Sequence, residues 1–376
     1  MHHWNETLLP TTMVGSYPRP RWFRHQLHGR DVLDAFKDFE HHEAYVDATR
    51  SVLRDQEMAG LDIATDGQMW FDDTHMGIGS FFWYWFERIG GFDKAMVAHR
   101  MLNRAEGRDV FVMEEAGSAQ VIGPIEPGPL HMDYLWDIAQ KSTSTPVKAG
   151  VGAGPAQLSG LVHFVDGPVK NRFQLAAGLA EVFNAELLAL QDAGCTYIQY
   201  EDLGAWTPNV TGPDDFPWVR DTVNRVMQGV HVHKAWHFCL GNAWGNRLDA
   251  LVRDGYGSVL PHYYDVDVDE LVLDFACRDM ADVGLLSDIP ERFRLGIGVI
   301  DVRNLEIEQP QQVADRIRMI LDHVGPERVT LTTDCGMKQL PRPVAVGKLR
   351  SLVAGARIVR EELTGVKDDG SVPAGS

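Results

Sequence analysis

The stretch that decides the fold runs from Leu295 to Thr333, with the sequence LGIGVI (295–300), DVRNLEIEQ (301–309), PQQVADRIRMILDHV (310–324), GPER (325–328) and VTLTT (329–333). Two short apolar runs have the length and composition of buried strands, and the segment between them has the apolar spacing of an amphipathic helix. A strand, a helix and a second strand in this order predict parallel strands joined by a right-handed crossover.

The same alternation continues outward along most of the chain. Further strands are predicted at 12–16, 61–65, 146–150, 197–200, 235–240 and 270–274, and further helices at about 34–58, 174–193, 218–227 and 345–362. Seven or eight such units favour an α/β fold of the (β/α)8 TIM-barrel type over an open sheet, and no GxGxxG follows the first strand. We expect a single domain over 1–376, with an insertion at about 81–129, where the alternation fails, and a frayed polar tail at 367–376.

Composition narrows the class of protein. The chain has 376 residues and a formal net charge of −18, which argues against a nucleic-acid or anionic-membrane surface because both require clustered Lys and Arg. Its four cysteines and a start without the features of a signal peptide predict a reducing, cytoplasmic location. The apolar stretch 78–86 is too short to span a bilayer. We expect a cytoplasmic enzyme that acts on small molecules. A homo-oligomer is compatible with the sequence.

Two motifs carry the chemistry: His237-Phe238-Cys239 and, about a hundred residues later, Thr333-Asp334-Cys335-Gly336. An imidazole and two thiolates are ligands that zinc prefers, and three protein ligands leave one position open for a substrate. Both motifs follow or end predicted strands, where ligands gather in barrel enzymes. The pattern alone also fits a buried core histidine and two ordinary buried cysteines.

A family resemblance rests on these motifs together with Thr11-Thr12-Met13-Val14-Gly15-Ser16-Tyr17-Pro18 and Thr333 to Lys338. Over nearly its whole length the chain resembles the catalytic barrel of cobalamin-independent methionine synthases. The resemblance implies Zn2+ held by His237, Cys239, Cys335 and a carboxylate on the next strand, here Asp274. The family usually has Glu there, so Asp274 is either a ligand with a shorter arm or a strand-end residue that caps the following helix.

Other positions depart from that family. Gln68 stands where the family has a Glu that holds the homocysteine ammonium, and Leu161 stands where it has a folate-stacking Trp. Arg303, in Asp301-Val302-Arg303, replaces a proton-handling His. Glu201 and Asp202 keep the paired acids that bind the amino acid in the family. These departures make folate an unexpected donor.

The departures favour relatives that use another thiol, the epoxyalkane:coenzyme M transferases, which the segment from Gly15 to Phe23 also resembles. In such an enzyme the zinc-bound thiolate of 2-mercaptoethanesulfonate opens a small aliphatic epoxide, so the chain would be a carbon–sulfur lyase. The expected substrate-binding residues are Ser16 and Gln68, Glu201 and Asp202, and cations for the sulfonate: Arg19, Arg21, Arg303 and Lys338. His75 and Tyr17 are the candidate general acids for the alkoxide.

Three functions therefore remain open from the sequence. The first is alkylation of coenzyme M by an epoxide, and the second is methyl transfer to homocysteine from a non-folate donor. Gln68 and Arg303 favour the first, whereas Glu201 and Asp202 favour the second. The third is a structural zinc in a binding or scaffold protein, which predicts a fourth protein ligand and a closed coordination sphere.

Overall fold

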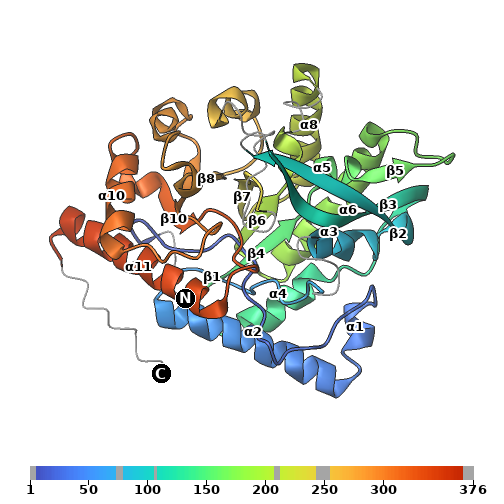
Figure 1. Cartoon of the computed structure of the whole chain (residues 1–376), viewed down its shortest axis with the longest axis horizontal. Coiled ribbons are helices and arrows are strands. Elements are labelled where there is room, and N and C mark those ends of the chain that lie inside the picture. The colour runs from blue at the N-terminus through green and yellow to red at the C-terminus, as the bar shows by residue number, and fades with distance from the viewer. Residues whose placement is uncertain (1–5, 73–78, 106–107, 207–211, 243–254, 367–376) are drawn as a thin grey trace.

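Parallel strands form a curled sheet of seven strands in the order β1-β4-β6-β7-β8-β9-β10 (Figure 1). The computed structural model describes residues 6–72, 79–105, 108–206, 212–242 and 255–366. The strands of this sheet are β1 (Ala64–Thr65), β4 (Val147–Gly152), β6 (Tyr197–Glu201), β7 (His233–Phe238), β8 (Glu270–Asp274), β9 (Arg294–Ile300) and β10 (Val329–Thr333). Every neighbouring pair is parallel, as the strand–helix alternation predicted, and the barrel-type α/β fold is confirmed.

The N-terminal segment closes the sheet between β10 and β1. The amide of Thr12 donates to the carbonyl of Leu331 at 2.9 Å, and Ile63, just before β1, donates to the carbonyl of Thr11 at 3.1 Å. Thr11 and Leu331 form only an isolated parallel bridge. The prediction of a regular strand at 12–16 is therefore wrong. Side chains bond its backbone instead, because Thr333 Oγ1 accepts from the Val14 amide and Thr65 Oγ1 donates to the Gly15 carbonyl.

Helices pack around the sheet and bury one face each. The longer ones are α2 (Phe39–Ala59), α4 (Met132–Gln140), α6 (Arg172–Asp192), α8 (Phe216–Val226), α10 (Pro310–Leu321) and α11 (Arg342–Thr364). Their ends follow ordinary capping chemistry. Asp38 accepts from the first free amides of α2, and Gly60 ends that helix at φ 87°, a conformation that a side chain would strain. The helices and strands share one extensive apolar core.

A second small sheet lies outside the main one, and two of its strands fall within the segment predicted as an insertion. It contains the antiparallel pair β2 (Gly90–Ala105) and β3 (Arg108–Glu126), and β5 (Val162–Phe164) pairs with β3. The pair forms a long ribbon in Figure 1, and β3 contacts α6. The aromatic run before it forms α3 (Gly79–Phe86), whose Trp85 and Phe86 are buried in the core.

Helix α6 is long and apolar enough to cross a membrane by length and composition alone. It packs against α4, α5 (Pro155–Ser159), α8 and β3, and Leu175, Leu179 and Phe183 are among its buried residues. This is the environment of a core helix in a globular barrel.

Candidate metal centre

His237, Cys239 and Cys335 meet at the carboxyl ends of the strands, although about a hundred residues separate them in sequence. One potential ligand atom from each lies within 4.8 Å of the others. His237 sits near the end of β7, Cys239 directly follows that strand, and Cys335 follows β10. Among the described residues, no other group of three such donors gathers.

The His237 imidazole is fully buried between carboxylates. Its Nε2 lies 2.9 Å from Asp274 Oδ1 and 3.1 Å from the Asp334 carbonyl oxygen, and its Nδ1 lies 3.6 Å from Glu201 Oε2. Burial alone would lower the pKa of His237, but Asp274 and Glu201 raise it above its ordinary value. The same two carboxylates also favour a bound cation.

The two thiols form a close pair, with Cys239 Sγ and Cys335 Sγ 3.4 Å apart. The hydrogen bond between them lowers the pKa of Cys335 and raises that of Cys239. Both are free cysteines, and Cys335 is partly exposed. Cys335 is therefore the first of the pair to become a thiolate, and it is the least buried member of the cluster.

This donor set fits a tetrahedral zinc ion. Two sulfurs bound at about 2.3 Å to one zinc would stand about 3.8 Å apart at the tetrahedral angle, close to the observed pair. The buried Nδ1 of His237 has no hydrogen-bond partner in the described parts of the chain. Three protein ligands, here an imidazole and two thiols, are the usual set of a catalytic zinc site, whereas a structural site takes four protein ligands.

Asp274, the expected fourth ligand, ends β8 beside this cluster but lies outside the group of three. Its Oδ2 accepts from the Leu240 amide at 2.9 Å and from Arg303 Nη2 at 2.7 Å. Burial alone would raise the pKa of Asp274, but His237 and Arg303 hold this pKa below its usual range. The carboxylate is thus ionised and fixed beside His237; its role as a ligand stays a prediction.

Glu201 lies next to the cluster at the end of β6. Gln199, on the same face of the strand, donates from Nε2 to Glu201 Oε1 at 3.2 Å, and Lys148 Nζ donates to Gln199 Oε1 at 2.6 Å. A side chain at Gly152 would collide with Glu201 and with the Phe81 ring. Glu201 is thus an oriented acid beside an aromatic ring.

Lys148 is expected to make stability depend on pH. Burial lowers the pKa of its ammonium from 10.5 to about 8, so folding disfavours the protonated form. The cost is fully present below pH 8 and disappears above pH 10.5. Replacing Lys148 by Met should therefore raise the unfolding free energy by up to about 3 kcal/mol at pH 7, since each pKa unit is worth about 1.4 kcal/mol. Urea unfolding at pH 7 and pH 10 measures it; an equal gain at both values would contradict this assignment.

Asp202, the second acid of the pair, is fully buried and turned to other partners. Its carboxylate accepts from the Tyr200 hydroxyl at 2.7 Å and from backbone amides of Ala156, Gln157 and Gly204 at 2.8 to 3.0 Å. Two of these amides begin α5. The contacts are those of a residue that fixes two loops, whereas the sequence predicted a substrate ligand.

Three further predicted residues lie in the N-terminal segment (Ser16 and Tyr17) and shortly after β1 (Gln68). Ser16 packs directly on the Asp-Cys-Gly turn, because a Cβ at Gly336 would collide with Ser16 Oγ. The Gln68 side chain is buried and its Nε2 lies 3.5 Å from the Gly150 carbonyl. The Tyr17 hydroxyl donates to Asp55 at 3.2 Å. Burial raises the pKa of Tyr17, and the nearby Asp55 carboxylate raises it further.

The predicted sulfonate-binding cations have different partners in the structure. Arg303 is buried in ion pairs with Asp274 and Asp334. Arg19 donates to the Met69 carbonyl at 2.8 Å and stacks over Phe23, and the Lys338 ammonium lies 5.3 Å from the centre of the Phe71 ring. Arg21 is exposed. The other candidate general acid, His75, falls outside the described residues.

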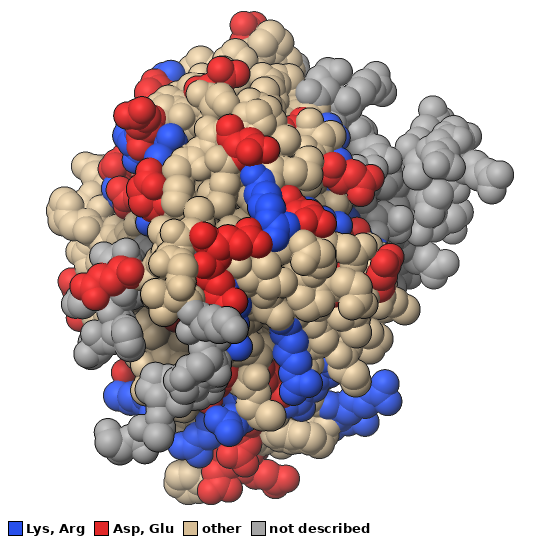
Figure 2. Space-filling view, turned by 90° about the vertical axis from the view of Figure 1, so that its left-hand side faces the viewer, with Lys and Arg blue, Asp and Glu red and all other residues tan. Residues whose placement is uncertain are grey.

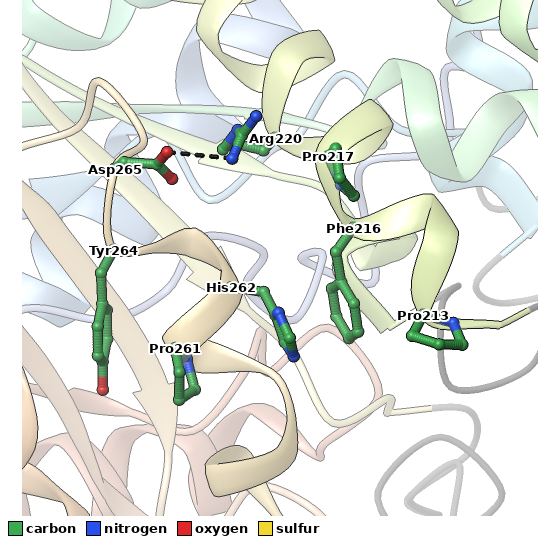
Figure 3. A pocket seen from close by; sticks show the side chains of 8 residues that line it. All are labelled: Pro213, Phe216, Pro217, Arg220, Pro261, His262, Tyr264 and Asp265. Atoms are coloured by element: carbon green, nitrogen blue, oxygen red, sulfur yellow. Dashed lines mark ion pairs between the residues drawn. The ribbon is translucent and has the colours of Figure 1, made fainter.

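A separate surface pocket of about 480 Å³ lies between the segments that follow β6 and β7 (Figure 3). The Phe216 and His262 rings stack in it with centroids 3.8 Å apart, and Arg220 pairs with Asp265 at 3.1 Å. It contains none of the residues of the metal centre. On the face shown in Figure 2, acidic and basic side chains are interspersed, without a broad basic area.

Three polar residues that support the site were not predicted from the sequence. Gln199 stands two positions before Glu201, so strand periodicity alone places both on one face. Lys148 is a charged residue inside an otherwise apolar strand, which is itself a signal. Asp334, whose carboxylate accepts from the amides of Ala276 and Cys277, was treated only as part of the Asp-Cys-Gly motif.

A parallel barrel whose strand ends carry a His-Cys-Cys cluster and a nearby acid defines a class of barrel enzymes with a metal centre. The chain belongs to the family of the cobalamin-independent synthase catalytic domain, whose model matches residues 9–358. This confirms the family resemblance inferred from the motifs.

Curated relatives are named methionine synthases. The protein of Pyrococcus horikoshii is 30% identical over 364 residues, which cover 95% of this chain and 94% of the relative. That of Sulfolobus acidocaldarius is 32% identical over 360 residues, with 95% and 94% covered. The solved B12-independent methionine synthase of Shewanella sp. W3-18-1, in complex with selenomethionine, is 26% identical with a TM-score of 0.78, covering 96% of this chain and 100% of that one.

Proposed function

We propose that the chain is a zinc-dependent methyltransferase that methylates the thiol of homocysteine, using a donor other than folate. The observation that carries this proposal is the cluster of His237, Cys239 and Cys335 beside the oriented acid Glu201, in a chain about 30% identical to methionine synthases over nearly their full length. The comparisons support this second hypothesis over the epoxide hypothesis. Free thiols at the site agree with the expected reducing cytoplasm.

His237, Cys239 and Cys335 would hold the zinc. Bound there, zinc would lower the pKa of a substrate thiol and keep its sulfur as a nucleophilic thiolate near pH 7. In the transfer the thiol loses its proton, a sulfur–methyl bond forms, and the bond from methyl to donor breaks with its electron pair leaving on the donor. The partly exposed side of Cys335 is where an external sulfur would enter.

Glu201 would bind the ammonium of homocysteine. Gln199 orients the carboxylate through Oε1, and the side chain keeps about a tenth of its surface exposed, so a substrate can reach it. An ionised carboxylate complements an ammonium, whereas the neutral amide of Gln68 does not. Glu201 would thus bind the ammonium without the Glu that the family has at the position of Gln68.

The epoxide hypothesis needs a cation that can bind the sulfonate of coenzyme M. Arg303, one of the two residues that favoured it, is only 5% exposed at its side chain and is paired with two buried carboxylates. A guanidinium that is paired with two carboxylates already has its charge balanced, so it offers less attraction to an incoming sulfonate. Glu201 therefore supports homocysteine as the thiol.

A substrate-pairing assay tests the proposal. Zinc-loaded protein receives homocysteine with methylcobalamin or with methyltetrahydrofolate, and 2-mercaptoethanesulfonate with epoxypropane, and products are followed by mass spectrometry. We expect methionine from homocysteine and methylcobalamin. A 2-hydroxypropyl thioether as the only product would overturn the proposal in favour of the epoxide hypothesis.

The Glu201→Gln variant is expected to lose affinity for homocysteine. Removing a charged hydrogen-bond partner costs roughly 2 kcal/mol or more, so KM should rise about 30-fold. The matched control is 4-mercaptobutanoate, which lacks the amino group and should be used equally well by both proteins. Equal losses with both thiols would show that Glu201 does not bind the ammonium.

A further inference from the structure

We propose that Arg303 is a positioning residue of the metal centre, which ties together the chain segments that carry its three ligands and acts chiefly through Asp274. The proposal rests on the metal centre alone and not on the identity of the thiol. Its test can therefore fail while methyl transfer to homocysteine stands, and the reverse also holds.

The Arg303 guanidinium contacts three different segments with its three nitrogens. Nε donates to the Gly241 carbonyl at 2.7 Å, Nη2 to Asp274 Oδ2 at 2.7 Å and Nη1 to Asp334 Oδ2 at 3.4 Å. Gly241 follows β7, Asp274 ends β8 and Asp334 follows β10. One planar group therefore spans the ends of three strands from the loop after β9.

Each contacted segment touches a ligand directly. The Asp274 carboxylate lies 2.9 Å from His237 Nε2, and the Gly241 amide donates to Cys239 Sγ at 3.2 Å. Asp334 precedes Cys335 in the chain, and its carbonyl oxygen lies 3.1 Å from His237 Nε2. A shift of Arg303 would thus reach His237 and Cys239 through direct contacts and Cys335 through the neighbouring Asp334, with Asp274 in contact with both Arg303 and His237.

Charge explains why a guanidinium is needed. Asp274 and Asp334 are both 0% exposed, and a buried carboxylate without a counter-charge costs several kcal/mol. The planar fork of Arg303 faces both at once, a geometry that neither Lys nor His offers. Where the related synthases have a proton-handling His, this chain has a cation that locks two acids.

The loop that carries Arg303 is itself held in place. Asp301 accepts from the Arg303 amide at 2.9 Å, and Glu308 accepts from the Asp301 amide at 2.9 Å. The buried Lys348 of α11 pairs with Glu308 at 3.0 Å. The guanidinium is thus delivered by an ordered support, as a positioning role requires.

Zinc affinity, measured by competition with a chromogenic chelator, tests the proposal without reference to activity. Arg303→Met should lower the affinity about 10- to 100-fold, the usual effect of removing a group that orients metal ligands. Arg303→Lys keeps the charge but loses the fork, so it should fold and still lose affinity. Thermal unfolding of the metal-free variants reports folding separately.

Arg294, the first residue of β9, provides the matched control at the opposite end of the strand that precedes Arg303. It ties β9 to β10 through Thr330 and the carbonyls of Glu327 and Val329, at the other end of the barrel from the metal centre. Arg294→Met should reduce thermal stability while zinc affinity stays within twofold of the parent. Equal affinity losses in Arg294→Met and Arg303→Met, or unchanged affinity in both Arg303 variants, would overturn the proposal.

A double variant tests the route through Asp274. Arg303→Met combined with Asp274→Asn should bind zinc about as weakly as Asp274→Asn alone, because the Arg acts on the metal through that carboxylate. Losses that simply add would mean that Arg303 works independently of Asp274 and would refute the mechanism.

Discussion

Replacing Cys335 by alanine is expected to remove bound zinc and methyl transfer together. Cys335 is the thiol whose pKa is lowered in the pair with Cys239, and it is one of only three candidate ligands that gather in the described chain. Loss of one of three protein ligands leaves a His and a single thiol, too few for a catalytic zinc site. We expect no stoichiometric zinc by elemental analysis and at least a 10³-fold loss of rate, since the thiol is then no longer activated near pH 7.

The control for this variant is Cys195→Ala. Cys195 is also a buried free cysteine, but it lies before β6, donates to the Tyr197 carbonyl at 3.3 Å and has a pKa raised to about 12 by burial. Its replacement should keep one zinc per chain and most of the activity. Full activity of Cys335→Ala without bound metal would end the zinc assignment.

Replacing Asp202 by alanine is expected to destabilise the fold by about 4 kcal/mol. The change leaves the three backbone amides and the Tyr200 hydroxyl without their acceptor in a fully buried place, and each such orphan costs about 1–3 kcal/mol. Part of this is recovered when water enters the space. Urea unfolding of the metal-free protein measures the loss.

Asp202→Asn separates this structural role from substrate binding. The amide keeps one acceptor oxygen and the shape of the side chain, so we expect a loss of about 2 kcal/mol in stability and little change in KM for homocysteine. An unchanged stability with a raised KM would instead place Asp202 among the substrate ligands, as the sequence suggested.

The fold was largely predictable because its signals are local. Strands such as 270–274 and 329–333 are short apolar runs between amphipathic helices, and the structure has them at the same residues. The segment 12–16 was wrong as a regular strand because side chains of Thr65 and Thr333, far away in sequence, bond its backbone. Its own residues carry no sign of those partners.

The site divides in the same way. The meeting of His237, Cys239 and Cys335 follows from the rule that the carboxyl ends of parallel strands share one edge. Arg303 was noticed as a departure, but its partners are 29 and 31 residues away and no spacing rule links them. The sequence thus shows which charged residues are present. Only the structure shows which of them are already paired with another charged side chain.

The closure of the sheet by residues 11 and 12 against Leu331 has a consequence for the order of events during synthesis. Residues 11 and 12 can join the sheet only when β10 has been made. The same strand brings Cys335 to His237 and Cys239. A growing chain would carry two of the three ligands long before the third. The centre can thus be completed only after residues 329–335 have been made and β10 has joined the sheet.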